Sequence, residues 1–166
     1  MQEIYLNSMH SLKPEEKRIS RYICVQMIYA YELSSLDNKK NYDSNFTKHF
    51  HTDLENSYGQ LSNAQLDYSK MLYSESIKNR DFIDKLIQKR LKNWDISRLA
   101  IIDRIILRMS ASEMFFIDEV PPKVSIAEGV EIAKVFSTKD SSSFVNGILD
   151  AIYNEVYIKD NKVSKV

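Results

Sequence analysis

The sequence has 166 residues, of which 43% are hydrophobic and 28% charged, and this is enough for one domain with a hydrophobic core. It contains only three glycines and three prolines. Compact β-rich and nucleotide-binding folds usually need more glycine, because tight turns and phosphate loops use positive φ angles. The formal net charge is zero, so the chain as a whole does not attract nucleic acid or an anionic membrane. Composition therefore favours an all-α protein, in which RNA binding would come from a local basic patch or be shared with a partner.

The cysteine content and the hydropathy pattern bear on the cellular compartment. Because Cys24 is the single cysteine, the chain cannot form an internal disulfide. Cys24 lies in an apolar helical run, so we expect an inert core thiol. The N-terminus has no continuous apolar stretch, and no segment approaches the roughly 20 apolar residues of a membrane span. Both absences predict a cytoplasmic protein without membrane contact.

The first predicted helix covers residues 14–34, where apolar residues recur with a helical period. Residues 35–60 are polar and Asn/Ser-rich, and we expect a long variable loop with room for a short helix. The loop contains His49 and His51, with Asp53 nearby. Two histidines two positions apart do not share a helical face, so a solvated loop is favoured over a metal site.

Three further helices are predicted before the Pro121-Pro122 pair. The second covers residues 63–78. The third begins at Asp81 as its N-cap and has an apolar stripe with i, i+3, i+4 spacing that consists of Ile83, Leu86, Ile87, Leu91 and Trp94. The fourth, residues 97–116, is apolar around most of its circumference, as expected of the central helix of a bundle. Its inward positions are expected to be Leu99, Ile102, Ile106 and Met109.

The dipeptide Pro121-Pro122 ends that run. Ser125 followed by Glu128 matches a capping box, which predicts a fifth helix from Ser125 to about residue 136. Asp140 or Ser141 is expected to cap the last helix. The buried face of that helix is expected to consist of Phe144, Val145, Ile148, Leu149, Ile152 and Val156. Residues 159–166 form a charged tail that we expect to be frayed.

Motifs for catalysis or cofactor binding are absent from the sequence. There is no GxGxxG or GxxxxGK[ST] loop, no CxxC pair, and no carboxylate pair whose spacing specifies an acid/base couple. Residues 141–143 are three serines, but capping explains them better than a nucleophile. We therefore expect no enzyme activity, no catalytic residues, no cofactor and no metal.

Two segments of the sequence are similar to the NusB transcription antitermination family. The first is RISRYICVQMIYAYEL, residues 18–33, with basic residues leading into a helix that carries a Gln and a Tyr. The second begins at Trp94 and Arg98-Leu99. It continues through DRIILR (103–108), SEM (112–114), VPPKVSIAE (120–128), EIAK (131–134) and FVNGILD (144–150). Gly147, in the last motif, is expected to lie where two helix backbones approach closely, because a Cβ there would collide.

The resemblance implies a single domain over residues 1–166, folded as an all-α bundle of two helical halves. It also implies a function. NusB proteins bind the boxA element of ribosomal RNA leaders together with the ribosomal protein NusE, and the complex helps to keep RNA polymerase in a termination-resistant state. The expected partners are therefore boxA-type single-stranded RNA, NusE and the RNA polymerase elongation complex.

Several residues are candidates for these contacts on the strength of the resemblance. The candidate RNA-binding residues are Lys17, Arg18, Arg21, Gln26, Lys123, Lys134, Asp140 and Phe144. Arg18 and Arg21 share a helix face, and without the resemblance they would be taken for a solvated helix end. Phe144 is either a core residue or a ring on which an RNA base stacks. Asp140 is either an N-cap or an acidic residue that weakens phosphate binding.

Two further residues match positions that face the ribosomal partner. Tyr29 is equally well explained as a core aromatic or as an interface residue. Asp103 is a polar position on an otherwise apolar helix.

Two other functions remain open from the sequence. One is a protein-interaction bundle without RNA binding, which the neutral charge and the sparse N-terminal cations favour. The other is a domain related to the NusB-like part of the ribosomal RNA cytosine methyltransferases. The second function needs a downstream catalytic domain with a Gly-rich loop and catalytic cysteines, and we do not expect it for this sequence.

Overall fold

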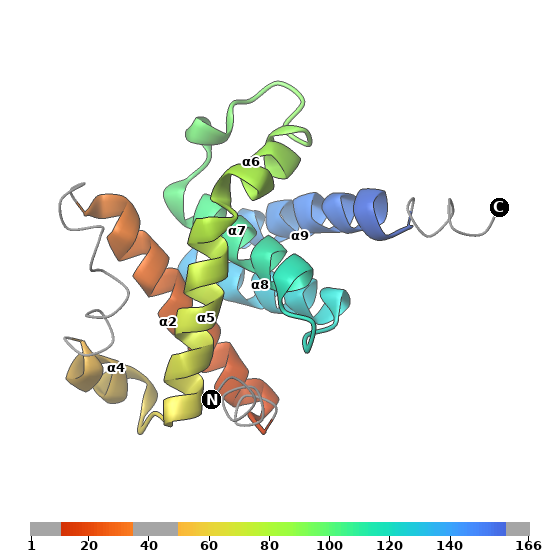
Figure 1. Cartoon of the computed structure of the whole chain (residues 1–166). Helices are drawn as coiled ribbons and strands as arrows, with labels where there is room; N and C mark the ends of the chain where they lie inside the picture. The colour runs from red at the N-terminus through yellow and green to blue at the C-terminus, as the bar shows by residue number, and fades with distance from the viewer. Residues whose placement is uncertain (1–10, 35–49, 159–166) are drawn as a thin grey trace. The chain divides into compact units, whose positions relative to one another are not determined.

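The computed structural model describes residues 11–34 and 50–158, and all regular elements within these residues are helical (Figure 1). The chain divides into two compact units, residues 1–77 and residues 78–166. The first unit contains α2 (Pro14–Leu33), α4 (His51–Tyr58) and α5 (Asn63–Lys78). The second contains α6 (Arg80–Gln88), the 3-10 turn η2 (Ile96–Arg98), α7 (Ile101–Phe116), α8 (Pro122–Phe136), α9 (Lys139–Tyr153) and the π-helical turn η3 (Asn154–Ile158). The predicted all-α class with two helical halves is confirmed.

In the first unit, α2 and α5 have the bounds predicted from apolar periodicity, to within one residue. Pro14 occupies the first turn of α2, where its missing N–H costs nothing. The Glu16 carboxylate accepts a hydrogen bond of 2.7 Å from the backbone N–H of Lys13, which closes that turn. The rings of Tyr31 in α2 and Tyr73 in α5 meet edge to face, with centroids 6.1 Å apart. Aromatic packing therefore joins these helices.

The segment predicted as a polar loop contains α4. Residues 35–49, which include His49, lie outside the described residues. His51 begins α4, and its Nδ1 lies 3.4 Å from the carboxylate of Glu55, one helical turn later. Within residues 11–34 and 50–158, no group of histidine, cysteine or carboxylate side chains has the geometry of a metal site.

The third predicted helix is wrong at both ends. It begins after Asn79, so Asp81 lies in the first turn of α6 and is not its N-cap. It ends at Gln88, because the Gln88 side chain donates to the carbonyl of Trp94 and accepts from the backbone N–H of Ile96, both at 2.9 Å. These hydrogen bonds hold the chain in a turn after α6. Trp94, expected to face inward, is 61% exposed.

Helix α7 is the central element of the second unit and contacts α6, α8 and α9 (Figure 1). Ile106 and Met109 are buried as predicted. Leu99 and Ile102 are only half-buried, which corrects the expectation for them. Leu99 and Ala100 have extended backbone conformations, so α7 starts four residues later than predicted, and Leu99 lies outside it.

The capping box predicted at Ser125 is wrong. Pro121 precedes α8 and Pro122 is its first residue, because the fixed φ angle of proline suits the first helical position. Ser125 and Glu128 therefore both lie inside the helix and are buried.

The predicted cap of the last helix is also corrected. Thr138 is the N-cap of α9, and its hydroxyl accepts a hydrogen bond from the backbone N–H of Ser141 at 3.3 Å. Asp140 lies in the first turn. The predicted apolar face is buried except for Phe144 and Val156, which are half-buried.

The glycine at which two helices approach closely is Gly129 in α8, not Gly147. A Cβ added at Gly129 would lie 2.5 Å from the Oγ and 3.1 Å from the Cβ of Ser110 in α7, and 3.2 Å from the Leu149 Cδ1 in α9. A Cβ added at Gly147 would have no atom within 4 Å. The expectation that Gly147 allows a close approach of two backbones is therefore wrong.

Substitution of the two helical glycines by alanine should have opposite effects on stability. Alanine is favoured over glycine inside a helix by about 0.5–1 kcal/mol, so Gly147→Ala should raise the free energy of unfolding by that amount. Gly129→Ala gains the same propensity, but the overpacking against Ser110 and Leu149 costs about 1–3 kcal/mol, so the variant should be less stable than the wild type. Urea denaturation monitored by circular dichroism measures both changes. Stabilisation by both substitutions would contradict the packing described for α7, α8 and α9.

Candidate nucleic-acid interface

The three N-terminal cations of α2 are not equally accessible. Arg21 is 2% exposed, so its side chain supports the packing of α2, and a direct phosphate contact would need a change of conformation. Lys17 and Arg18 are half-buried. The Lys17 ammonium lies 5.7 Å from the centroid of the Tyr68 ring in α5, a cation–π contact within the first unit.

Further along α2, Gln26 and Tyr29 differ in their environments. The Gln26 amide donates a hydrogen bond to the Tyr58 hydroxyl in α4, and the ring of Tyr58 also contacts Tyr22, with centroids 6.0 Å apart. Burial raises the pKa of Tyr58, so its hydroxyl stays protonated at neutral pH. Tyr29 is 38% exposed. Gln26 therefore connects α2 with α4, whereas Tyr29 presents its ring to solvent.

Asp103 has a role inside the second unit that the sequence does not reveal. It lies in the first turn of α7 and is 9% exposed. Its carboxylate accepts hydrogen bonds from the hydroxyls of Ser137 at 2.6 Å and Ser141 at 3.0 Å. The Ser141 hydroxyl also lies 2.9 Å from that of Thr138. This hydroxyl cluster joins the start of α7 to the connection between α8 and α9.

The first turns of α9 carry two of the candidate RNA-binding residues on one face. Asp140, Phe144 and Gly147 follow at i, i+4 and i+7, a spacing that places them on one side of a helix. Asp140 is exposed, Phe144 is half-buried, and Gly147 is exposed, with no atom within 4 Å of a Cβ added there. Phe144 is therefore partly exposed, with an acidic residue one turn before it.

The two lysines of α8 lie at opposite ends of that helix. The Lys123 ammonium lies 3.4 Å from the Asp150 carboxylate and 4.3 Å from the Tyr153 ring centroid, both in α9. Lys134 pairs with Glu131 of its own helix at 2.6 Å. Their side chains are 62% and 52% exposed. Such exposed pairs contribute about 0–1 kcal/mol, so a phosphate can replace the carboxylate at little cost.

The structure thus places Lys134, Asp140 and Phe144 around the end of α8 and the start of α9, and Lys123 at the far end of α8. Ser137 and Thr138, which fix this junction, were not predicted from the sequence. A run of hydroxyl residues between two predicted helices was the available signal, because such side chains cap helix starts.

Loss of the Asp103 carboxylate should destabilise the second unit. Asp103→Ala would remove the carboxylate that accepts from the half-buried Ser137 hydroxyl and the buried Ser141 hydroxyl, at a cost of about 1–3 kcal/mol in the free energy of unfolding. The triple variant that adds Ser137→Ala and Ser141→Ala should recover part of this loss, because no hydroxyl then lacks its acceptor. Chemical denaturation of the three proteins provides the comparison. A single variant as stable as the wild type would show that the cluster does not hold the junction.

None of the helices in the described residues has the length and apolar character needed to cross a membrane.

Comparisons with known proteins converge on one family. The model of the NusB family matches residues 18–154. The transcription antitermination protein NusB of Chloroherpeton thalassium is 39% identical over 143 residues, which are 86% of this chain and 64% of that protein. The protein of the same name from Salinibacter ruber is 45% identical over 91 residues, which are 55% of this chain and 57% of that protein. The protein of the same name from Syntrophus aciditrophicus is 31% identical over 147 residues, which are 89% of this chain and 85% of that protein. The chain thus spans less than two thirds of the first two relatives.

Solved structures agree with the sequence comparison. NusB of T. maritima superposes with a TM-score of 0.68 at 26% identity, covering 87% of this chain and 94% of that one. NusB of Aquifex aeolicus superposes with a TM-score of 0.67 at 25% identity, covering 87% of this chain and 91% of that one. A chain from a structure of antitermination factors NusB and NusE in complex with dsRNA shares the fold, with a TM-score of 0.68 at 21% identity and coverages of 86% and 99%. With a family match over residues 18–154, the chain belongs to the NusB family.

Proposed function

We propose that this protein is a transcription antitermination factor that binds boxA-type RNA of ribosomal RNA leaders together with the ribosomal protein NusE. In this proposal the complex acts on the RNA polymerase elongation complex in the cytoplasm, and the protein performs no catalysis. The observation that carries the proposal is family membership, with relatives named transcription antitermination protein NusB that are 31–45% identical.

The pairing with NusE is supported by a structural neighbour. A chain of the same fold was solved in a structure of NusB and NusE with double-stranded RNA. We propose Tyr29 as a direct contact to NusE, because its ring is partly exposed on α2. For Asp103 we propose an indirect effect, because its carboxylate is already bound by two hydroxyls of the α8–α9 junction.

The start of α9 is the surface we propose for RNA in the second unit. Phe144 offers an aromatic face for a base, and Lys134 offers a phosphate contact whose present ion pair is weak. Asp140 reduces the local positive potential, which suits a protein that binds RNA weakly alone and more tightly with a partner. In the first unit, Lys17 and Arg18 are the proposed cations, with Arg21 and Gln26 supporting the packing around them.

A protein-interaction bundle without RNA binding is the second candidate. Zero net charge and the burial of Arg21 both favour it, because they reduce the number of cations available to phosphates. A titration of boxA-type RNA and a scrambled RNA into the protein premixed with NusE separates the candidates. A preference for boxA-type RNA supports antitermination, and no RNA binding at all supports the interaction bundle.

Two substitutions should separate base stacking from phosphate contact. Phe144→Leu removes the ring but keeps an apolar side chain for the core, and it should cost about 1–3 kcal/mol of RNA affinity without changing the salt dependence. Lys134→Gln should lower the slope of log affinity against log salt by about 0.7, the value for one phosphate on a single strand. Fluorescence anisotropy of labelled boxA-type RNA, with NusE present and at several salt concentrations, measures both effects.

Val135→Ala is the matched control, because Val135 is 59% exposed beside Lys134 and has no proposed contact. If Phe144→Leu and Lys134→Gln bind RNA as well as this control and the wild type do, the proposed surface at the start of α9 is wrong.

A further inference from the structure

A local excess of positive charge lies in the second unit, although the whole chain is neutral. Residues 85–98 contain five basic residues and one acidic residue, a net charge of +4. Glu155 of η3 pairs with Lys89 and Arg90 and offsets one of these charges. Lys85, Lys92 and Arg98 are exposed, and the Lys89 side chain is 64% exposed. This segment therefore presents several cations to solvent.

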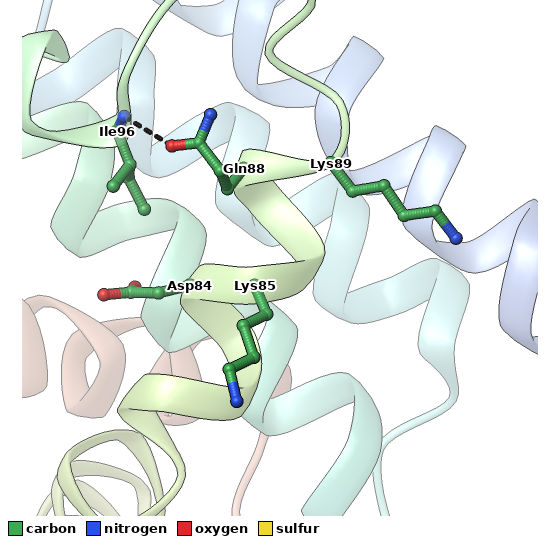
Figure 2. A pocket seen from close by; sticks show the side chains of 5 residues that line it. All are labelled: Asp84, Lys85, Gln88, Lys89 and Ile96. Atoms are coloured by element: carbon green, nitrogen blue, oxygen red, sulfur yellow. Dashed lines mark hydrogen bonds between the residues drawn. The ribbon is translucent and has the colours of Figure 1, made fainter.

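An open depression of about 500 Å³ lies beside these cations and is lined by Asp84, Lys85, Gln88, Lys89 and Ile96 (Figure 2). Its one acidic residue, Asp84, is bound by the Arg108 guanidinium through two hydrogen bonds of 2.7 and 2.8 Å. The charge of Asp84 is thus balanced from within the unit. The two lysines, Lys85 in α6 and Lys89 directly after it (Figure 2), determine the sign of the potential in the depression.

Trp94 lies at the turn that the Gln88 side chain holds. Gln88 donates to the Trp94 carbonyl and accepts from the Ile96 N–H, the second of which is drawn in Figure 2. These two bonds fix the backbone on both sides of the turn. The Asp95 carboxylate accepts a hydrogen bond from the backbone N–H of Ser97 at 2.8 Å. Hydrogen bonding from the Ser97 hydroxyl, and then from this N–H, lowers the pKa of Asp95. The indole is nevertheless 61% exposed. An exposed ring is therefore held on a rigid turn.

The Arg98 guanidinium lies over the Trp94 ring, 5.9 Å from its centroid. Arginine and tryptophan in this arrangement form the kind of platform on which nucleic-acid bases stack, because every base has a π face and the cation adds an attractive contribution. Lysines at the rim of such a platform suit the phosphates of the same strand.

We propose that residues 85–98 form a second RNA-binding surface, in which Trp94 stacks on a base and Lys85, Lys89 and Lys92 contact phosphates of a single strand. This surface is separate from the candidate residues of α8 and α9 and requires neither NusE nor the boxA sequence. Single-stranded RNA is favoured over an acidic peptide because the ring and guanidinium provide a stacking face, which a peptide carboxylate does not use.

The chain contains one tryptophan and ten tyrosines, so fluorescence excited at wavelengths that tyrosine does not absorb reports on this surface alone. A single-stranded RNA should quench the emission of Trp94 in the full-length protein as it binds, whether or not it contains boxA. Polyglutamate of equal charge serves as the comparison. Quenching by polyglutamate as strong as that by RNA would overturn the assignment to RNA, as would bound RNA that leaves the emission unchanged.

Variants test the two roles separately, with anisotropy of labelled RNA as the readout. Trp94→Leu should weaken binding roughly 5- to 100-fold, and Trp94→Phe should retain most of the affinity because it keeps a ring. Lys85→Gln with Lys92→Gln should lower the salt slope by about 1.4. Phe116→Leu, an exposed aromatic of α7, and the pair Lys70→Gln with Lys78→Gln from α5 are the controls.

The outcomes distinguish this inference from the proposed function. Equal loss of affinity in Trp94→Leu and Phe116→Leu would contradict the second surface. RNA binding without NusE that depends on Trp94 would support the second surface, whereas the absence of a boxA preference with NusE present would contradict the antitermination proposal and leave the second surface standing.

Discussion

The second unit depends on the buried carboxylate of Asp103. By accepting hydrogen bonds from Ser137 and Ser141, it holds the two-residue connection between α8 and α9 against the first turn of α7. Because α7 contacts every other α-helix of the unit, this attachment determines where α9 begins, and with it the position of Phe144. A change at Asp103 would therefore alter ligand binding through the placement of α9, even where no ligand touches the carboxylate.

Much of the fold follows from local sequence patterns. The bounds of α2 and α5 were predictable because their apolar periodicity, and Pro14 at the start of α2, agree with the tertiary packing. The end of α6 was not predictable, because the Gln88 side chain ends that helix by hydrogen-bonding to backbone atoms six and eight residues later in the sequence. The start of α8 was missed because Ser125 and Glu128 have the spacing of a capping box, whereas Pro122 begins the helix.

The candidate site was less predictable, since it depends on contacts between residues distant in the sequence. Asp103 meets hydroxyls 34 and 38 positions away, and no local pattern indicates this. The two helical glycines could not be distinguished from their motifs, because only the packing of α7, α8 and α9 shows that Gly129 lacks room for a Cβ. The sequence did indicate that RNA binding must be local in a neutral chain, and residues 85–98 have the charge this requires.

Hydrogen–deuterium exchange with boxA-type RNA and NusE tests the central claim, RNA binding at the start of α9, most directly. We expect slower exchange of amides in residues 139–146 when boxA-type RNA joins the complex with NusE, beyond the effect of NusE alone. A scrambled RNA of equal length should protect these amides less. Unchanged exchange in residues 139–146 while RNA is bound, or equal protection by both RNAs, would contradict the account.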